Sequence, residues 1–118
     1  MPPTSQPLAA PPLQPNVLLI LAALGDGPSH GYRIRQEVIE RSDGAARLDP
    51  GHLYRLIVRL VDERLIAEAE PPRGEDRDDE RRKYYALTAR GRSVLKAEVD
   101  RLAALVSGVR ASLSRKRV

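Results

Sequence analysis

Two arginines lie four residues apart in a segment whose pattern predicts a helix. Arg55 and Arg59 occupy its polar side, and residues at this spacing project in nearly the same direction from a helix. The opposite side carries an apolar stripe of Leu53, Leu56, Ile57, Leu60 and Val61. Arginine is the side chain best shaped for two-pronged contact with guanine or phosphate. The spacing therefore favours contact with DNA over the alternative, a helix face that is merely solvated.

The neighbours of these arginines extend the same candidate surface. Asp49 is a good N-cap, Pro50 suits the first helical position, and Gly51 follows in the first turn. His52 lies in this turn, where side chains that read DNA bases cluster; a base contact and a solvated position both remain open for it. Tyr54 lies off the apolar stripe, and its hydroxyl can donate to a phosphate, with simple packing as the alternative. The candidate DNA contacts on this helix are Gly51, His52, Tyr54, Arg55 and Arg59.

A basic cluster follows further along the chain. Residues 1–80 hold 9 Lys and Arg against 14 Asp and Glu, whereas residues 81–118 hold 11 against 2. Such a block suggests a polyanionic partner, because neutralising phosphates releases condensed counterions; a solvated helix face is the alternative. Arg81, Arg82 and Lys83 open the block and are further candidate phosphate contacts. Alternation along a strand would place Arg82 on one face and its two neighbours on the other.

The sequence lacks the residue constellations that catalysis needs. The chain has two His and no Cys, which leaves poor ligand prospects for a transition metal. It has no glycine-rich phosphate loop and no nucleophile beside a base, and the acidic pair Asp78-Asp79 lies in a polar loop. His30 is expected to order a turn rather than bind a ligand. We therefore expect neither an enzyme nor a cofactor.

The composition indicates a globular chain with an aliphatic core. Hydrophobic residues make up 42% and charged residues 31% of the chain, and Trp, Phe and Cys are absent. The longest apolar run, from Val17 to Leu24, is far shorter than the roughly 20 residues of a membrane span. No basic start precedes this run, which argues against a signal peptide. We expect a cytoplasmic protein without a membrane partner.

Turn and capping residues divide the first half of the chain into short elements. Prolines crowd residues 1–14, which are expected to form a flexible arm. A first helix is expected to begin at Pro15 and, being apolar on every side, to be buried. Ser29 is expected to cap a second helix of about 12 residues, and the third begins at Pro50.

Two short strands and a long helix complete the pattern. Residues 65–69 and 83–87 are expected to pair as a hairpin with a long polar tip, and Thr88 to cap a helix that runs to about residue 113. Three helices followed by a hairpin is the order of a winged helix-turn-helix, whose third helix enters the major groove of DNA. We expect a mostly α fold with a small β-hairpin (α+β), divided into the arm, a DNA-binding domain over residues 15–89 and a dimerisation helix over residues 90–118.

The final helix carries apolar residues at alternating spacings of four and three. They are Leu95, Val99, Leu102, Val106, Val109 and Leu113, an a/d pattern of almost three heptads that we call the apolar seam. The seam predicts a homodimer whose two reading helices lie about one DNA turn apart on an inverted-repeat operator; packing against the first helix of the same chain is the alternative. A membrane-surface helix is disfavoured, because the stripe is only as wide as a coiled-coil seam.

Several motifs together resemble the PadR family of transcriptional regulators. They are the apolar run at residues 18–24, Gly-Pro-Ser-His-Gly-Tyr at residues 27–32, Leu-Asp-Pro-Gly-His-Leu-Tyr at residues 48–54, Arg59-Leu60, and Arg-Lys-Tyr-Tyr-Ala-Leu-Thr at residues 82–88 with Gly91. The resemblance implies a winged-helix DNA-binding domain, a C-terminal dimerisation helix, and a regulator that is usually a repressor and sometimes released by a small molecule. The alternative function is a winged-helix module that binds another protein without binding DNA.

Two positions depart from the family pattern. The family often has Thr where this chain has His52, so no base preference is carried over to that position. It usually places Gly before the first strand of the wing, where this chain has Arg64. If the third helix ends there in a left-handed residue, arginine meets a penalty of about 1 kcal/mol; a different helix end is the alternative.

Overall fold

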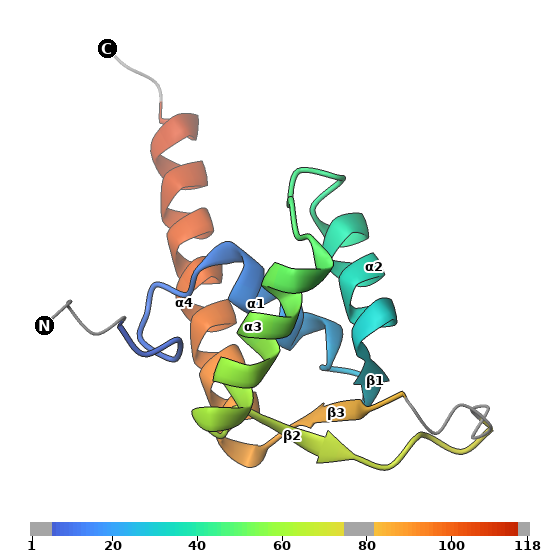
Figure 1. The fold of residues 1–118 in the computed structure, drawn as a ribbon. Helices are drawn as coiled ribbons and strands as arrows, with labels where there is room; N and C mark the ends of the chain where they lie inside the picture. The colour runs from blue at the N-terminus through green and yellow to red at the C-terminus, as the bar shows by residue number, and fades with distance from the viewer. Residues whose placement is uncertain (1–5, 75–81, 116–118) are drawn as a thin grey trace, which may run out of the picture.

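Four helices and a small sheet make up the described part of the chain. The computed structural model describes residues 6–74 and 82–115. The elements are α1 (Pro15–Ala23), β1 (Ser29–His30), α2 (Gly31–Arg41), α3 (Pro50–Asp62), β2 (Ile66–Ala69), β3 (Tyr84–Leu87) and α4 (Ala89–Ser114). Figure 1 shows α1, α2 and α3 on one side of the hairpin of β2 and β3, with the long α4 projecting beyond the other helices. This α+β architecture is the predicted winged helix-turn-helix.

The sheet has one strand more than the sequence predicted. Its order is β1-β3-β2 with both pairs antiparallel, and its register pairs Ser29 with Tyr85 and Ile66 with Leu87. β1 has only two residues, too few for an alternation of polar and apolar side chains to be visible in the sequence. This extra strand attaches the start of α2 to the first two residues of β3, at the loop end of the hairpin.

The capping residues predicted for α3 and α4 do begin these helices. The Asp49 carboxylate accepts a hydrogen bond from the His52 amide at 2.8 Å. The Thr88 hydroxyl accepts one from the Gly91 amide at 3.0 Å. Each bond satisfies an amide that has no partner within its own helix, so both helix starts are determined by local sequence.

α2 begins differently from the prediction. Ser29 was expected to cap it, but Ser29 pairs with β3 as part of β1. The cap is the next residue, His30, whose Nδ1 accepts a hydrogen bond from the Arg33 amide at 3.3 Å. The strand pairing thus moves the helix start along by one residue, and His30 orders this turn, as expected for it.

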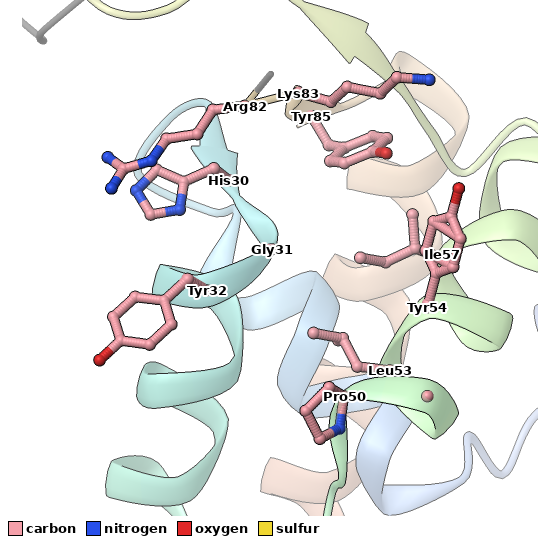
Figure 2. Close-up of a pocket in the computed structure, with 11 residues that line it drawn as sticks. His30, Gly31, Tyr32, Pro50, Leu53, Tyr54, Ile57, Arg82, Lys83 and Tyr85 are labelled. Atoms are coloured by element: carbon pink, nitrogen blue, oxygen red, sulfur yellow. The ribbon is translucent and has the colours of Figure 1, made fainter. Parts of the chain in front are cut away.

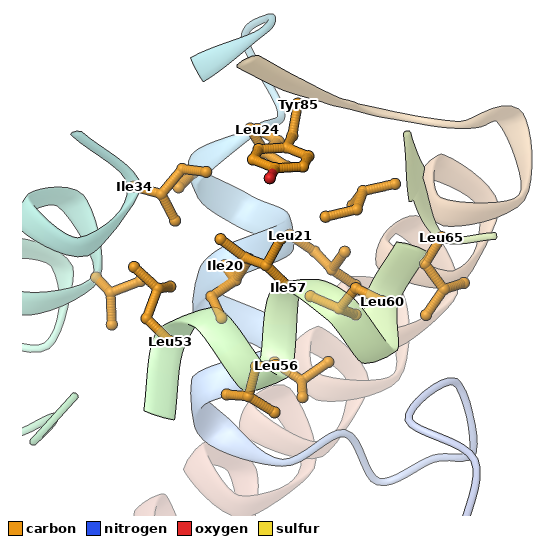
Figure 3. Close-up of a cluster of buried hydrophobic side chains, with 14 of the residues drawn as sticks. Ile20, Leu21, Leu24, Ile34, Leu53, Leu56, Ile57, Leu60, Leu65 and Tyr85 are labelled. Carbon is orange, nitrogen blue, oxygen red and sulfur yellow. The ribbon is translucent and has the colours of Figure 1, made fainter. Parts of the chain in front are cut away.

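An aliphatic core holds the three short helices together. Figure 3 shows side chains from α1, α2 and α3 meeting beneath Tyr85 of β3. The largest fully buried side chains are Ile20, Leu21, Leu24, Ile34, Leu60, Leu65, Ile66, Val17 and Val38. The buried residues of α3 are Leu53, Leu56, Ile57 and Leu60. Because these four share one side of α3, the opposite side of that helix is directed away from the core.

α3 ends in the left-handed residue that the sequence raised as one alternative. Arg64 has a φ of 62°, its amide donates to the Val61 carbonyl at 2.9 Å, and the Leu65 amide donates to the Leu60 carbonyl at 2.9 Å. These two bonds form a Schellman motif, the helix end that glycine suits best. The departure from the family pattern therefore leaves arginine in a conformation that costs it about 1 kcal/mol.

The N-terminal segment differs from the expected flexible arm. Over residues 6–14 it is packed: Leu8 and Leu13 are 4% and 7% exposed. The Leu8 and Ala9 amides donate to the Glu63 carboxylate at 2.9 and 3.2 Å, and the Leu13 amide donates to Glu98 at 2.8 Å. The proline content of this segment predicted a flexible arm. The packing could not be predicted from the segment itself, because the two leucines are buried against helices and the two carboxylates lie far away in the sequence. We call residues 6–14 the docked arm.

Candidate nucleic-acid interface

The outward face of α3 is the first part of the candidate interface. Opposite the buried stripe, its exposed positions are Gly51, Arg55, Val58 and Asp62, whereas Tyr54 and Val61 are exposed on the flank toward the hairpin. A methyl group on Gly51 would lie 3.5 Å from Nη1 of Arg55 and 3.3 Å from Oδ1 of Asp49. Arg55 therefore extends back over the first turn of the helix. The His52 amide lowers the pKa of the Asp49 carboxyl, and the charge of Arg55 lowers it further. The guanidinium of Arg55 therefore lies beside Gly51 and close to the N-cap carboxylate of Asp49.

A cleft adjoins this face of α3. It has a volume of about 660 Å³ and lies between the first turn of α2, α3 and the start of β3. Four candidate DNA contacts line it, namely Gly51, Tyr54, Arg82 and Lys83. Figure 2 shows Tyr32 on the α2 side of the cleft, Tyr54 and Ile57 on the α3 side, and Tyr85 on the β3 side. The cleft thus brings the first turns of α2 and α3 together with Arg82 and Lys83 at the loop end of the hairpin.

The basic cluster at the loop end of the hairpin, directly before β3, is divided between two directions. Figure 2 shows Arg82 extending toward His30 while Lys83 extends to the other side, as strand alternation predicted. Lys83 Nζ lies 3.5 Å from Glu68 Oε1, and this carboxylate raises the pKa of Lys83. Both side chains are more than half exposed, so water screens the pair and a phosphate can replace Glu68. Arg81 lies outside the described residues.

Two other candidates, Arg59 and His52, lie seven residues apart on another flank of α3, and Arg59 contacts the docked arm. Arg59 donates from Nη2 to the Gln6 carbonyl at 3.2 Å, and the same nitrogen lies 3.8 Å from Glu63 Oε2. His52 is half-buried and donates its amide to Asp49. Arg55 and Arg59 therefore do not share one free surface, although their spacing predicted it. The difference arises from the docked arm, whose position the sequence did not indicate.

Two residues of the outward face were missed by the sequence analysis. Val58 is 46% exposed, and Asp62 is exposed at the end of the helix. They follow Arg55 by three and seven residues and so share its side of the helix. Helical spacing from Arg55 predicts that both residues share its side of the helix. The candidates were chosen by positive charge and by hydrogen-bonding side chains at the helix start, and these criteria do not select a valine or an aspartate.

The basic block is spread more widely than the candidate interface. Arg82 and Lys83 lie beside α3. The other described basic residues of the block lie in α4 or directly after it, namely Arg90, Arg92, Lys96, Arg101, Arg110 and Arg115. For most of this block, the alternative of a solvated helix face therefore fits the structure better than direct contact beside α3.

The apolar seam divides into a covered part and an uncovered part. Leu95 packs partly against the core, and Leu102 is half-buried. Val99, Val106 and Val109 are each 48% exposed, and Leu113 is 81% exposed. Packing within the chain, the alternative weighed from the sequence, thus accounts for only the first part of the seam. The second part extends beyond the other helices (Figure 1).

Over residues 6–74 and 82–115, no group of three or more His, Cys, Asp and Glu side chains is placed to hold a metal ion. In those ranges no helix is both long and apolar enough to cross a membrane.

Comparison with known proteins identifies a family and a relative. Residues 20–97 match the model of the transcriptional regulator PadR-like family. Over 88 residues the chain is 38% identical to an uncharacterised 37.1 kDa protein in transposon TN4556 of Streptomyces fradiae. That match covers 75% of this chain but only 23% of the relative, so the chain spans about a quarter of the length of that protein.

Solved structures of regulators share the fold. A PadR family transcription regulator from Clostridium difficile has a TM-score of 0.65 and 24% identity, over 82% of this chain and 96% of that one. A PadR-like transcriptional regulator from Bacillus cereus has a TM-score of 0.66 and 20% identity, over 84% and 91%. RosR from H. salinarum has a TM-score of 0.60 and 29% identity, over 84% and 79%.

Proposed function

This chain belongs to the PadR-like family of transcriptional regulators, and we propose that it binds double-stranded DNA as a homodimer and represses transcription. The observation that carries the proposal is the outward face of α3, which includes Arg55, with the cationic residues Arg82 and Lys83 of the hairpin beside the helix. A winged helix places this helix in the major groove and the hairpin along the backbone. The family is one of regulators rather than enzymes, and we propose no catalytic activity.

The proposed contacts have separate roles. Arg55 extends over the first turn of α3, where side chains reach base edges, and we assign it to guanine or phosphate. Tyr54, Arg82 and Lys83 line the cleft beside α3 and are assigned to phosphates, which position a protein without carrying sequence information. Arg59 would have to leave Gln6 and Glu63 before it could contact DNA, so we give it a secondary role.

The proposed homodimer uses the uncovered part of the apolar seam. Exposed apolar residues at heptad spacing need a partner, and a second copy of α4 offers the same pattern in return. Two-fold symmetry would then place two α3 helices on one side of the dimer, which predicts an inverted-repeat operator. Bound at a promoter, such a dimer would act as a repressor.

We extend the proposal to release by a small molecule. The cleft of about 660 Å³ is large enough for a drug-sized compound. A molecule bound there would occupy space beside Tyr54 and Lys83, and would therefore compete with the DNA backbone for the same side chains.

Selection of bound duplexes from a random pool tests the DNA-binding proposal. We expect a preferred sequence with two-fold symmetry, bound about fivefold to 150-fold more weakly by Arg55→Ala, because a good arginine contact contributes about 1–3 kcal/mol. Arg110→Ala is the matched control, since Arg110 is exposed on α4 away from α3, and its affinity should change by less than about twofold. If the folded dimer enriches no sequence and binds no DNA at low salt, the alternative of a protein-binding winged helix replaces this proposal.

A further inference from the structure

The outward face of α3 includes one apolar side chain. Opposite the buried stripe, the helix presents Gly51, Arg55, Val58 and Asp62 at spacings of four, three and four. Val58 lies between Arg55 and Asp62 along this line and is 46% exposed. The face therefore changes along its length from a cation, through an apolar side chain, to a carboxylate.

Valine is an unfavourable choice for a solvated position in a helix. Its branched β-carbon restricts the side-chain rotamers against the preceding turn, which lowers the helix propensity of valine. At an exposed position, little apolar surface is buried to offset this cost. One side of Val58 borders a shallow hollow of about 230 Å³ between α3 and the hairpin, which Val61 and Tyr85 also line. Almost half of the Val58 side chain still faces outward, so packing within the chain does not fully account for this valine.

We infer that Val58 determines sequence specificity by contacting the methyl group of a thymine. This inference rests on the proposed function, which places the outward face of α3 in the major groove. There, thymine is the base that presents a methyl group, and apolar side chains contact it. Arg55, one turn earlier, directs the helix to an anionic or guanine partner. Asp62, one turn later, repels phosphates. Contact between the outward face and DNA should therefore extend from the first turn of α3 as far as Val58 and end before Asp62.

Uracil substitution provides the test. In the duplex obtained by selection, each thymine is replaced in turn by deoxyuridine, which removes only the methyl group, and affinity is measured for the wild type and for Val58→Ala. We expect one thymine per half-site at which uracil weakens wild-type binding about fourfold, the equivalent of one buried methyl group. For Val58→Ala the same substitution should have no effect, because the contact is already lost.

Val61→Ala is the matched control. Val61 is also an exposed valine of α3, but it lies toward the hairpin rather than on the outward line. Its variant should keep the wild-type preference for thymine over uracil. The inference is overturned if no uracil substitution weakens the wild type, or if Val58→Ala retains the preference. In both cases Arg55→Ala would still lose affinity, so the proposed function would stand; failure of the wild type to bind any DNA would remove both.

Discussion

At the scale of single residues, Gly91 is the position with the least space for a side chain. It lies in the first turn of α4, and a methyl group added there would overlap the backbone carbonyl of Leu65. This close approach attaches α4 to the end of α3, where Leu65 also accepts a hydrogen bond from the Thr88 amide at 3.1 Å. A glycine is required here by contact rather than by its backbone angles.

Gly91→Ala should therefore lower the free energy of unfolding by about 1–3 kcal/mol or more, because the helix must move to admit the methyl group. Gly108→Ala is the control within the same helix, since nothing lies within 4 Å of the added methyl group. It should raise stability by up to about 1 kcal/mol through helix propensity. Urea unfolding at one fixed protein concentration measures both changes. Equal stability of wild type and Gly91→Ala would contradict the packing of α4 on Leu65.

Arg64 illustrates how far one residue could be read from the sequence. The comparison with the family pattern allowed a left-handed helix end, and the φ of 62° confirms it. The choice between this end and another could not be made from the sequence, because it depends on where the Leu65 side chain is buried. That burial is complete, at 0% exposed, and it determines the direction in which the chain leaves α3.

At the scale of elements, the structure agrees with the sequence wherever a local signal determines the outcome. The caps Asp49 and Thr88, most of the apolar stripe of α3 and the two strands of the hairpin all have such signals within a few residues. Val61 was predicted in that stripe but is 36% exposed. β1 and the docked arm have no such signals. β1 forms because it pairs with the edge of β3. The docked arm is held by hydrogen bonds to Glu63 and Glu98, which lie over 50 residues away in the sequence. Contacts between residues this far apart cannot be predicted from the local periodicity of apolar and polar residues.

The same distinction applies to the candidate site. Tyr54, Arg82 and Lys83 line one cleft, and the sequence could associate them because α3 and the hairpin both have local signals. The separation of Arg59 from Arg55 could not be predicted, because it follows from the Gln6 carbonyl of the docked arm. For the same reason, a helical wheel predicts which residues are exposed but not which of them another segment covers.

Acid should loosen the attachment of the docked arm to α4. Glu98 is 3% exposed, and it accepts hydrogen bonds from Arg101 at 2.6 and 2.8 Å and from the Leu13 amide at 2.8 Å. Arg101 and then the Leu13 amide lower the pKa of Glu98 from 4.5 to about 2. Since the pKa is lower in the folded state, the stabilisation is fully present above about pH 4.5 and is lost as the pH falls toward 2.

Thermal unfolding of Glu98→Gln measures this effect, because glutamine keeps the shape of the side chain but does not titrate. The stability advantage of the wild type over Glu98→Gln should be greatest near neutral pH and should shrink below about pH 4.5. Glu40→Gln, which removes an exposed carboxylate of α2, controls for the loss of one negative charge. An advantage that stayed constant down to pH 2 would show that Glu98 does not hold the arm through its charge.

At the scale of the whole molecule, α4 has two different environments. Its first turns pack on the core through Val94 and Leu95 and receive the docked arm at Glu98. Its last three turns expose Val106, Val109 and Leu113. A rigid attachment at one end and an uncovered apolar stripe at the other are what a dimerisation helix needs, because the attachment transmits the geometry of the pair to α3.

Val106→Glu should convert the proposed dimer to a monomer. Val106 lies in the middle of the uncovered part of the seam, and a glutamate there would meet its own symmetry mate or desolvate a charge. We choose it over Leu102, which is half-buried within the chain and whose replacement would also disturb the fold. Light scattering at micromolar concentration should give half the wild-type mass, and helical content by circular dichroism should be retained.

Ala104→Glu is the control for this last prediction. Ala104 is exposed on the opposite side of α4 from the seam, so an added charge there should leave the dimer intact. Affinity for an inverted repeat should fall by about 10² or more for the Val106→Glu monomer, since its two half-sites are no longer bound together. Affinity for a single half-site should change little, because α3 and the cleft are unaltered. A dimeric Val106→Glu variant would instead mean that the copies pair elsewhere, and the spacing predicted for the operator would no longer follow.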